Sequence, residues 1–472
     1  MKFSVEGLLR AGLDLTPPFS VDLWIDPEGS VEDRPTTPLS YTKVARILPG
    51  RRLSGFANYK NEPVFAKLFY GKGARRYWSR EIKGSEQMRR VGTRTPDVLH
   101  TGATSDNQGF VVLYEAIKQP ASLKEDDLPS MSSAVDQVAK LHDGGLMQTD
   151  IHLDNFVVSA GVVHLVDADG VRPDTLLRRH FKNLALLLAQ RGPWLDRDIP
   201  QLWHSYVSQR GEYVEKMGSA EQILQLTQQE RRHRVSRYLA KTQRECTEFV
   251  QHKRFTRDFV CDREHWLRLQ RFMVLPEVYL GEGVPLKLGN SATVVRCVIG
   301  GEPYVIKRYN IKSFGHRVRR WFKRRGRNAW SNGHWLAFLG IDTARPLALL
   351  ERRIGWFAGV SYVVMPDIGD RDLGQVLSTE PESFSEIADQ VVALLLKLSA
   401  ANICHGDMKA TNFIQQQYTD DDGSHATRIV LIDVDAVSEG SLDKDKARFL
   451  ANWQNDPEML SGWQQKFSEA GL

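Results

Sequence analysis

The chain has 472 residues and a net charge of +5, with 42% hydrophobic and 26% charged residues. These values are ordinary for a folded soluble protein, and the length predicts two or three domains. The four cysteines are scattered without a CxxC pair, which excludes a disulfide framework and fits a reducing compartment. The longest apolar runs, LALLLA and VVALLL, are far shorter than the ~20 residues of a membrane span. We therefore expect a cytoplasmic protein without a transmembrane segment.

The chain begins with residues 1–40, where TPPFSVDLWIDPEG and DRPTTP predict an irregular extension without a chemical motif. The segment YTKVARILPGRRLSGFANYKNEPVFAKLFY then alternates β-branched and aromatic residues with Gly-bearing turns, which predicts strands up to Lys67. A lysine in such a strand is suited to binding phosphate oxygens, although a snorkelling edge-strand lysine gives the same pattern. A helix with Glu81 and Glu86 follows, and then the apolar strand GFVVLYEAI.

The stretch MQTDIHLDNF, residues 147–156, carries Asp150 and, five residues later, Asn155. A short strand, the small-residue turn SAG and a second strand follow, and the second strand ends in Asp167 and Asp169. Because a hairpin returns its second strand to the level at which the first began, Asn155 and Asp167 should lie close together. An amide oxygen beside a carboxylate forms a site of hard oxygen ligands, which Mg²⁺ prefers.

Two basic segments occupy the middle of the chain, RRHRVSRYLAKTQRE at residues 231–245 and HRVRRWFKRRGRNAW at residues 316–330. One interpretation is a solvated helical face. The other is a surface for a polyanion, such as anionic lipid head groups, phosphorylated glycans or nucleic acid. Trp321, Phe322 and Trp330 are interleaved with the basic residues, which favours a membrane interface. We therefore expect an anionic membrane surface as a partner, and no nucleic acid.

The second half of the chain repeats this order of elements. LKLGNSATVVRCVIGGEPYVIKRYN predicts three strands, with Gly289 in the first turn and Lys307 in the last strand. The helix segment RNAWSNGHWLAFLGIDTARPLALL has no acidic residue before Asp342, and the apolar strand SYVVMPDIG follows it. A single glycine is a weak signal for a phosphate-binding loop, and its value here comes from standing before Lys307.

The stretch CHGDMKATNF, residues 404–413, repeats the Asp and Asn of MQTDIHLDNF. Asp407 and Asn412 are again five residues apart, and the hairpin that follows them ends in Asp433 and Asp435. We expect Asn412 and Asp433 to form a second site for Mg²⁺ for the same geometric reason. One such set of residues could arise by chance, but two sets with the same spacing indicate an internal repeat.

These residues resemble the protein-kinase-like fold, because a strand lysine, an Asp-x-x-x-x-Asn loop and a later Asp form the kinase signature. WSNGHWLAFLGIDTARPLALLE and TQRECTEFVQHKRFTRDFVCDRE are more narrowly similar to the bacterial lipopolysaccharide core kinases, which phosphorylate heptose or Kdo sugars. The resemblance implies an α+β protein with two kinase-like domains in tandem, each with a β-rich N-lobe and a helical C-lobe. The expected parts are an N-terminal extension (1–40), the first domain (41–228), a basic helical connector (229–270) and the second domain with a short C-lobe (271–472).

The resemblance implies an ATP- and Mg²⁺-dependent phosphotransferase that adds phosphate to a sugar hydroxyl of the lipopolysaccharide inner core. In the second domain it assigns Asp407 to orienting the acceptor hydroxyl and Lys409 to neutralising charge on the transferred phosphoryl group. The other residues that it assigns there are Gly289 and Lys307 for ATP and Asn412 and Asp433 for Mg²⁺. The corresponding residues of the first domain are Lys67 and Glu81 for ATP, Asp150 as the base, and Asn155 and Asp167 for Mg²⁺.

The resemblance further implies lipopolysaccharide core–lipid A, or another glycan, as the acceptor. Such an acceptor would place the protein at the cytoplasmic face of the inner membrane as a peripheral protein.

The two expected domains depart from the kinase pattern at different places. HGD in the second domain and QTD in the first lack the arginine of His-Arg-Asp, which favours a glycan or small-molecule acceptor over a protein. Gln148 replaces the usual histidine in the first domain, and the helix glutamate is absent from the second. We favour the second domain as the working site because its loop, with Lys409, matches better.

Two alternative functions remain open. HGD fits a soluble small-molecule kinase of the aminoglycoside or choline type equally well, although such enzymes usually have an acidic acceptor pocket. The departures from the kinase pattern are also compatible with a tandem pseudokinase that scaffolds envelope enzymes.

Overall fold

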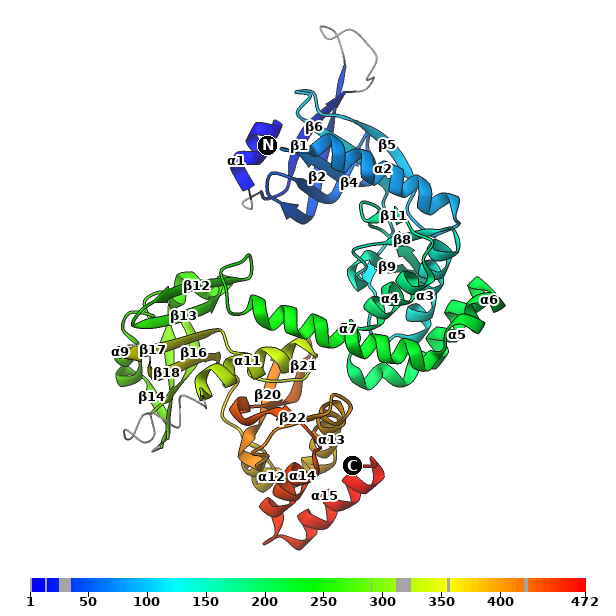
Figure 1. The fold of residues 1–472 in the computed structure, drawn as a ribbon. Helices are drawn as coiled ribbons and strands as arrows, with labels where there is room; N and C mark the ends of the chain where they lie inside the picture. Colours follow the sequence, from blue (N-terminus) through cyan, green and yellow to red (C-terminus); the bar gives the residue numbers. More distant parts are fainter. Residues whose placement is uncertain are drawn as a thin grey trace. The chain divides into compact units, whose positions relative to one another are not determined.

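The computed structural model of the chain contains two compact units (Figure 1). Unit 1 comprises Met1–Arg191 and Leu195–Arg231, and unit 2 comprises Gly192–Trp194 and Arg232–Leu472. The residues that the structure describes are 2–12, 15–24, 35–289, 291–310, 324–354, 357–419 and 423–472. Trp321 and Phe322, on which the predicted membrane interface partly depends, lie outside these ranges. Within the ranges, no helix combines the length and the apolar character that crossing a bilayer requires.

Unit 1 begins with a six-stranded antiparallel sheet in the order β1-β2-β3-β4-β6-β5. Helix α2 packs against β4 and β6 of this sheet (Figure 1). The elements are α1 (Val5–Ala11), β1 (Phe19–Trp24), β2 (Thr36–Leu48), β3 (Arg52–Tyr59), β4 (Glu62–Tyr70), α2 (Ala74–Arg90), β5 (Val98–Ala103) and β6 (Gly109–Glu115).

The prediction of an irregular extension over residues 1–40 is wrong, because this segment contributes strand β1 to the sheet. Phe19 lies opposite Tyr41 in the register, and the two rings stack 5.0 Å apart. Val21 and Leu23 are buried in the same core. The sequence FSVDLW alternates apolar and polar residues as a half-buried strand does, but proline- and glycine-rich flanks obscure this short pattern.

The rest of unit 1 is mainly helical and encloses a core that includes one face of α3. The predicted hairpin is confirmed as β9 and β10, with Ser159 opposite Val162 and the turn at Ala160 and Gly161. The elements are β7 (Ala121–Ser122), α3 (Leu128–Asp143), β8 (Leu146–Gln148), β9 (Phe156–Ser159), β10 (Val162–Leu165), β11 (Val171–Pro173), α4 (Leu177–Leu188), α5 (Ile199–Arg210), α6 (Glu212–Met217) and α7 (Ala220–Lys241).

Unit 2 contains a seven-stranded sheet in the order β12-β13-β17-β18-β16-β15-β14. The three strands predicted around Gly289 and Lys307 are confirmed as β14, β15 and β16, and α11 packs on β17 and β18. The elements are β12 (Phe249–Arg254), β13 (Arg257–Asp262), α8 (Trp266–Leu269), α9 (Pro276–Glu282), β14 (Val284–Leu288), β15 (Ala292–Ile299), β16 (Glu302–Tyr309), α11 (Arg325–Phe338), β17 (Ala348–Ile354) and β18 (Phe357–Pro366).

The prediction of a basic helical connector over residues 229–270 is only partly correct. The end of α7 is helical, but β12 and β13 form an antiparallel hairpin that joins the sheet of unit 2 through β17. Phe259 and Cys261 are fully buried in the core of that sheet. The basic residues of the hairpin concentrate near its exposed tip. Because they dominate the composition of the segment, the composition did not indicate the two strands.

The helical part of unit 2 is short, and aromatic residues close its core. Phe449 lies edge-on against Phe413 at 5.4 Å and against Trp463 at 4.8 Å, and all three are fully buried. Such pairs add to the stabilisation from burial. The elements are α12 (Leu373–Thr379), α13 (Phe384–Ala400), β19 (Ile403–Cys404), β20 (Phe413–Thr419), β21 (His425–Leu431), β22 (Ser438–Glu439), α14 (Asp443–Leu450) and α15 (Pro457–Glu469).

The first basic segment, residues 231–245, lies mostly on α7 and serves more than one purpose. Arg231 is buried and forms a two-point ion pair with Asp196 at 2.6 and 2.9 Å. Arg232 and Arg237 are exposed. The segment therefore contains one structural ion pair, and its exposed arginines are compatible with both interpretations.

Acidification should destabilise unit 2 through His334, which is fully buried in α11 with its Nδ1 atom 3.0 Å from the Tyr238 hydroxyl. Burial lowers the pKa of His334 to about 3, whereas the unfolded chain takes up this proton near pH 6.5. The free energy of unfolding should therefore fall as the pH drops below 6.5, by about 2 kcal/mol between pH 7 and pH 5.

His334→Gln should make the free energy of unfolding depend less on pH between 7 and 5, even if the substitution lowers stability at pH 7. The measurement is the urea midpoint for unfolding of unit 2 at pH 7 and at pH 5. Pulsed hydrogen exchange of the full-length protein, read from the peptides that cover α11, monitors the unfolding. His204→Gln, at an exposed position of unit 1, is the control. An unchanged pH dependence in His334→Gln would contradict the assignment.

Candidate active sites

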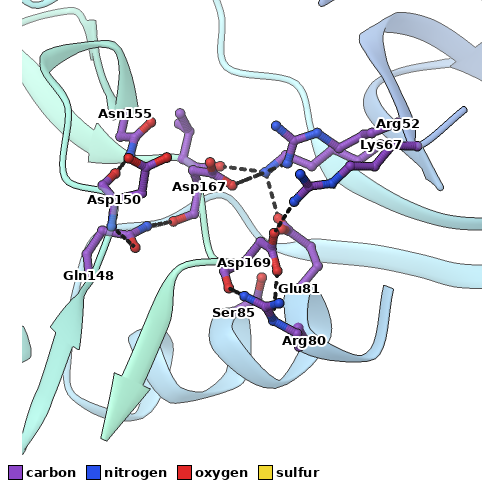
Figure 2. A network of polar contacts seen from close by, with 12 residues as sticks. Arg52, Lys67, Arg80, Glu81, Ser85, Gln148, Asp150, Asn155, Asp167 and Asp169 are labelled. Carbon is purple, nitrogen blue, oxygen red and sulfur yellow. Dashed lines mark hydrogen bonds and ion pairs between the residues drawn. The ribbon is translucent and has the colours of Figure 1, made fainter. Parts of the chain in front are cut away.

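A buried lysine forms the centre of the polar network in unit 1 (Figure 2). Lys67 on β4 places its Nζ atom 2.6 Å from Glu81 Oε1 on α2 and 3.2 Å from Asp167 Oδ1 at the end of the hairpin. The Tyr114 hydroxyl donates to the same Glu81 oxygen at 2.6 Å. Burial by itself lowers the pKa of Lys67, but Glu81 and Asp167 outweigh it and the pKa is raised. The lysine is therefore charged and held in one position.

The carboxylate of Asp167 has a second cationic neighbour that the sequence did not reveal. Arg52 at the start of β3 lies 3.6 Å from Asp167 Oδ1, and its side chain is only 11% exposed. Burial raises the pKa of Asp167, but Lys67 and Arg52 reverse this effect and lower it. Asp169 forms its ion pairs elsewhere, with Arg80 of α2 at 3.1 Å and Arg51 at 3.5 Å. Asp169 therefore ties α2 to the hairpin.

The loop between β8 and β9 presents Asp150 to solvent, with 81% of its side chain exposed. His152 Nε2 lies 3.2 Å from Asp150 Oδ1. The Asn155 amide donates to the Asp150 carbonyl oxygen at 2.8 Å, which leaves the amide oxygen available as a ligand. Asn155 and Asp167 line one pocket, so the structure brings together the residues that the hairpin geometry predicted.

The loop in unit 2 has the same internal bonds. The Asn412 amide donates to the Asp407 carbonyl oxygen at 2.8 Å, the distance found in unit 1. The carboxylate of Asp407 lies between two cations, Lys409 at 3.1 Å and Arg448 at 2.7 Å. All three side chains are between one third and one half exposed. The Asp407 carboxylate is therefore accessible to solvent and has two cationic side chains beside it.

Gln148 bonds the loop and the end of the hairpin as the histidine that it replaces does, but its carbonyl partner lies one residue further along the chain. In unit 2, His405 is buried, contacts the Ile432 carbonyl through Nε2 at 3.0 Å and accepts from the Asp407 backbone N–H at 3.4 Å. In unit 1, Gln148 donates to the Asp167 carbonyl and accepts from the Asp150 backbone N–H. Gln148 therefore supports the loop as His405 does, and its presence is no evidence of a degenerate site.

Lys307 of unit 2 forms an ion pair with Asp433 Oδ1 and has no glutamate from the neighbouring helix. Helix α11 instead contributes Arg325, whose Nε atom lies 2.5 Å from Asp435 Oδ2. Burial raises the pKa of Asp433, but Lys307 reverses this effect and lowers it. Asp433 has a left-handed backbone with φ of 59°, a conformation that persists only where its surroundings enforce it.

Asp445 is a site residue that the sequence did not indicate. It is buried at the start of α14 and accepts the backbone N–H groups of His405 at 2.5 Å and Gly406 at 3.0 Å. Gly406 has φ of 79°, and a Cβ atom there would lie 2.8 Å from the Ala436 carbonyl oxygen, so the loop requires glycine at this position. In the sequence, Asp445 belongs to the charged run DKDK, which reads as an exposed helix start.

A pocket of about 180 Å³ in unit 1 opens beside Lys67 and Asp167. Its lining is apolar at Phe56 and Ile117 and polar at Arg46, Arg52 and Asn155. An apolar slot with a cationic end suits a planar ring that carries an anionic group. In unit 2, Gly289 lies in the turn between β14 and β15, where its N–H bonds the Ala292 carbonyl at 3.1 Å; Asn290 lies outside the described residues.

The oxygen ligands differ in how well they fit Mg²⁺. In the described part of the chain, no group of three His, Cys, Asp or Glu residues could hold a metal ion. Mg²⁺ at phosphate-transfer sites commonly takes one or two protein oxygens and completes its shell with phosphates and water. Asn412 and Asp433 fit this pattern in unit 2. In unit 1, two cations already compensate Asp167, so the fit there is poor.

The similarities to known proteins are distant. No protein-family model matches the sequence, and no curated protein matches it. A solved structure of WaaP in complex with acyl carrier protein is 19% identical, with 40% of this chain and 88% of that chain covered and a TM-score of 0.31. A structure of vaccinia related kinase 3 is 10% identical, with 48% and 79% covered and a TM-score of 0.27. Because these TM-scores are low, the proposals below depend on the site geometry.

Asp445→Ala should loosen the loop of unit 2, because the buried N–H of His405 and the partly buried N–H of Gly406 lose their acceptor. Each unpaired buried group costs about 1–3 kcal/mol, so hydrogen exchange of residues 404–409 should accelerate by roughly tenfold or more. The measurement is hydrogen exchange by mass spectrometry. Asp445→Asn, which keeps one acceptor oxygen, should be intermediate.

The matched control for Asp445→Ala is Asp443→Ala, because Asp443 is exposed on the same helix and bonds only to its neighbours Ser441 and Lys446. Exchange in the 404–409 segment should be unchanged in this variant. Equal exchange rates in the Asp445 and Asp443 variants would show that the carboxylate does not hold the loop.

Proposed function

We propose that the protein is an ATP-dependent phosphotransferase with two kinase-like domains in tandem, and that it phosphorylates a sugar hydroxyl of the lipopolysaccharide inner core. One observation carries the proposal, which is the occurrence of the same constellation in both units. In each unit a buried strand lysine contacts the aspartate at the end of a hairpin. In each, an asparagine fastens the loop aspartate through its carbonyl oxygen.

This arrangement is suited to positioning two substrates, which is the main protein contribution to phosphoryl transfer. Lys307 would bind donor phosphates while Asp407 accepts the hydrogen bond of the acceptor hydroxyl. Lys409 would neutralise negative charge on the phosphoryl group as it passes from donor to acceptor. Mg²⁺ held by Asn412 and Asp433 would supply further compensation of the phosphate charge. In unit 1, Lys67 and Glu81 would bind donor phosphates and Asp150 would accept the hydrogen bond of the acceptor hydroxyl, whereas Asn155 and Asp167 fit Mg²⁺ poorly because Lys67 and Arg52 already compensate Asp167.

The surroundings of Asp407 support an anionic acceptor. Lys409 and Arg448 flank this carboxylate and are partly exposed, so an acceptor that carries carboxylate or phosphate groups gains a favourable contact. A cationic acceptor of the aminoglycoside type would meet repulsion from the same two side chains. The charges therefore favour a lipopolysaccharide core sugar over the small-molecule kinase alternative. The pseudokinase alternative is weakened in one of its two arguments, because Gln148 still bonds both the loop and the end of the hairpin.

Single replacements of the loop aspartates test the proposed activity. With Mg²⁺-ATP and core glycolipid, Asp407→Ala should reduce phosphate transfer by about 10²-fold or more, because the acceptor hydroxyl loses its base. Asp150→Ala gives the contribution of unit 1. Asp154→Ala, an exposed position in the loop of unit 1, should leave transfer unchanged. Radiolabel transfer from ATP to the glycolipid measures the outcome.

The activity assay distinguishes the alternatives directly. Phosphate transfer that is undiminished in each of the two single variants, Asp407→Ala and Asp150→Ala, would contradict the assignment of these aspartates as bases. Transfer to aminoglycosides but not to the glycolipid would favour the small-molecule kinase, and no transfer by the wild type to any acceptor would favour the scaffold.

We further propose that unit 2 contacts an anionic membrane surface. Phe255 at the tip of the β12–β13 hairpin is 70% exposed and stands between Arg254 and Arg257. These arginines line shallow pockets together with the apolar Met273 and Val274. An exposed aromatic residue among cations matches the interfacial region of an anionic bilayer. Such attachment would suit a cytoplasmic enzyme with a lipid-linked acceptor.

Vesicle binding tests the membrane contact. The protein should co-sediment with phosphatidylcholine vesicles that contain 30% phosphatidylglycerol but not with pure phosphatidylcholine, and binding should weaken as salt is raised. Arg254→Ala and Phe255→Ser should each weaken binding by roughly fivefold, since a basic residue near such a surface contributes about 1 kcal/mol. Leu99→Ser, at an exposed apolar position of unit 1, is the control. Equal binding of all variants would contradict the proposed surface.

A further inference from the structure

The two units differ in what surrounds the aspartate at the end of the hairpin. In unit 1, Asp167 Oδ1 lies 3.2 Å from Lys67 and 3.6 Å from Arg52 (Figure 2). Lys67 pairs with Ser54 across the sheet, and Arg52 stands two residues before Ser54, so both cations project from the same face. Arg52 therefore reaches the carboxylate beside the strand lysine, at the place where a metal ion would lie.

Arg52 is held in the site but is not fully bonded. Its side chain is 11% exposed, and its buried Nε–H has no hydrogen-bond partner among the described residues. A buried donor without a partner is costly, which indicates room for a ligand that accepts from it. Arg52, Lys67 and Arg46 all line the pocket of unit 1. The guanidinium is planar and can bind phosphate through two N–H groups.

In the described part of unit 2, Ala292 stands at the place of Arg52, two residues before Val294, which pairs with Lys307 across the sheet. The turn between β14 and β15 reads Gly289-Asn290-Ser291 and carries no basic residue. Arg325 is the nearby cation from the helix, and it forms an ion pair with Asp435. In the described part of the chain, Lys307 is therefore the only ion-pair partner of Asp433, and Arg325 acts on it from further away. We expect a divalent cation to compensate the charge of incoming phosphates there.

We propose that unit 1 binds a nucleoside triphosphate without a divalent cation, with Arg52 providing the positive charge that Mg²⁺ provides in unit 2. The inference rests on the proposed function, which identifies the pocket beside Lys67 as a nucleotide site. A Mg²⁺ ion at Asp167 would stand next to two cations and be repelled by both. The same two cations attract phosphate oxygens, and Arg52 can bond to both the phosphates and Asp167.

The test uses the full-length chain with Asp433→Ala, which removes the metal-binding carboxylate of unit 2. A fluorescent ATP analogue is titrated in excess EDTA and again in excess Mg²⁺. Because Arg52 replaces the metal, the two dissociation constants should agree within about threefold. In Asp433→Ala with Lys67→Ala, the EDTA binding should be lost, which places it in unit 1.

Arg52→Ala in the same background should weaken binding in EDTA by at least about tenfold, the loss of one charge-assisted contact. Mg²⁺ should then restore part of the affinity. Arg52→Lys keeps the charge and should bind the nucleotide in EDTA with intermediate affinity. This variant shows whether the loss in Arg52→Ala comes from the missing charge or from a folding defect. Arg51→Ala is the matched control, because Arg51 is adjacent but contacts Asp169, and it should change the affinity by less than threefold.

The outcomes separate this inference from the proposed function. If the Asp433→Ala protein binds nucleotide only with Mg²⁺, the inference is wrong and the proposed function stands. An Arg52→Ala variant that binds as well in EDTA as its parent also overturns the inference. If no nucleotide binds to this protein with or without Mg²⁺, the assignment of unit 1 as a nucleotide site fails, and the inference fails with it.

Discussion

A buried lysine beneath each sheet is the constraint on which both sites depend. Lys67 and Lys307 have less than a tenth of their side chains exposed, and a buried ammonium group requires a carboxylate nearby. In both units that carboxylate comes from the end of a hairpin about 100 or more residues further along the chain. The ion pair therefore fixes the sheet against the helical part and sets the position of the loop aspartate at the same time.

The helix beside each sheet is attached to the strand lysine in unit 1 but not in unit 2, and the two units share a different contact. In unit 1, α2 supplies Glu81 to the lysine and Arg80 to Asp169. In unit 2, α11 supplies Arg325 to Asp435, and its Asn332 amide donates to the Val434 and Val437 carbonyls. The contact shared by the two units is thus the one between the helix arginine and the second aspartate of each Asp-x-Asp pair. The absence of a glutamate from α11 leaves this attachment intact, so it does not by itself imply a disordered site.

The sequence predicts those parts of the sites that depend on local geometry. The spacing of Asp and Asn, the hairpins and the strand lysines all follow from turn chemistry and strand periodicity, and the structure has them where expected. Strands β1 and β12–β13 are missed because short alternating patterns lie among prolines, glycines or basic residues. Arg52, Asp445 and Arg448 are missed for another reason. They reach the sites across 39 or more residues, and only tertiary packing determines which of many charged residues does so.

The comparison of Gln148 with His405 changes the basis on which the two units should be ranked. A residue that differs in kind also accepts from the N–H of the loop aspartate and bonds a carbonyl at the end of the hairpin, so the motif letters do not separate a working loop from a degenerate one. The placement of positive charge does separate the units. Unit 1 gathers its cations around Asp167, where donor phosphates would lie, and unit 2 gathers them around Asp407, where an acceptor would lie. The two copies of one constellation thus share their bonded framework and differ in where they place positive charge, so the charge and not the motif is the basis for ranking them.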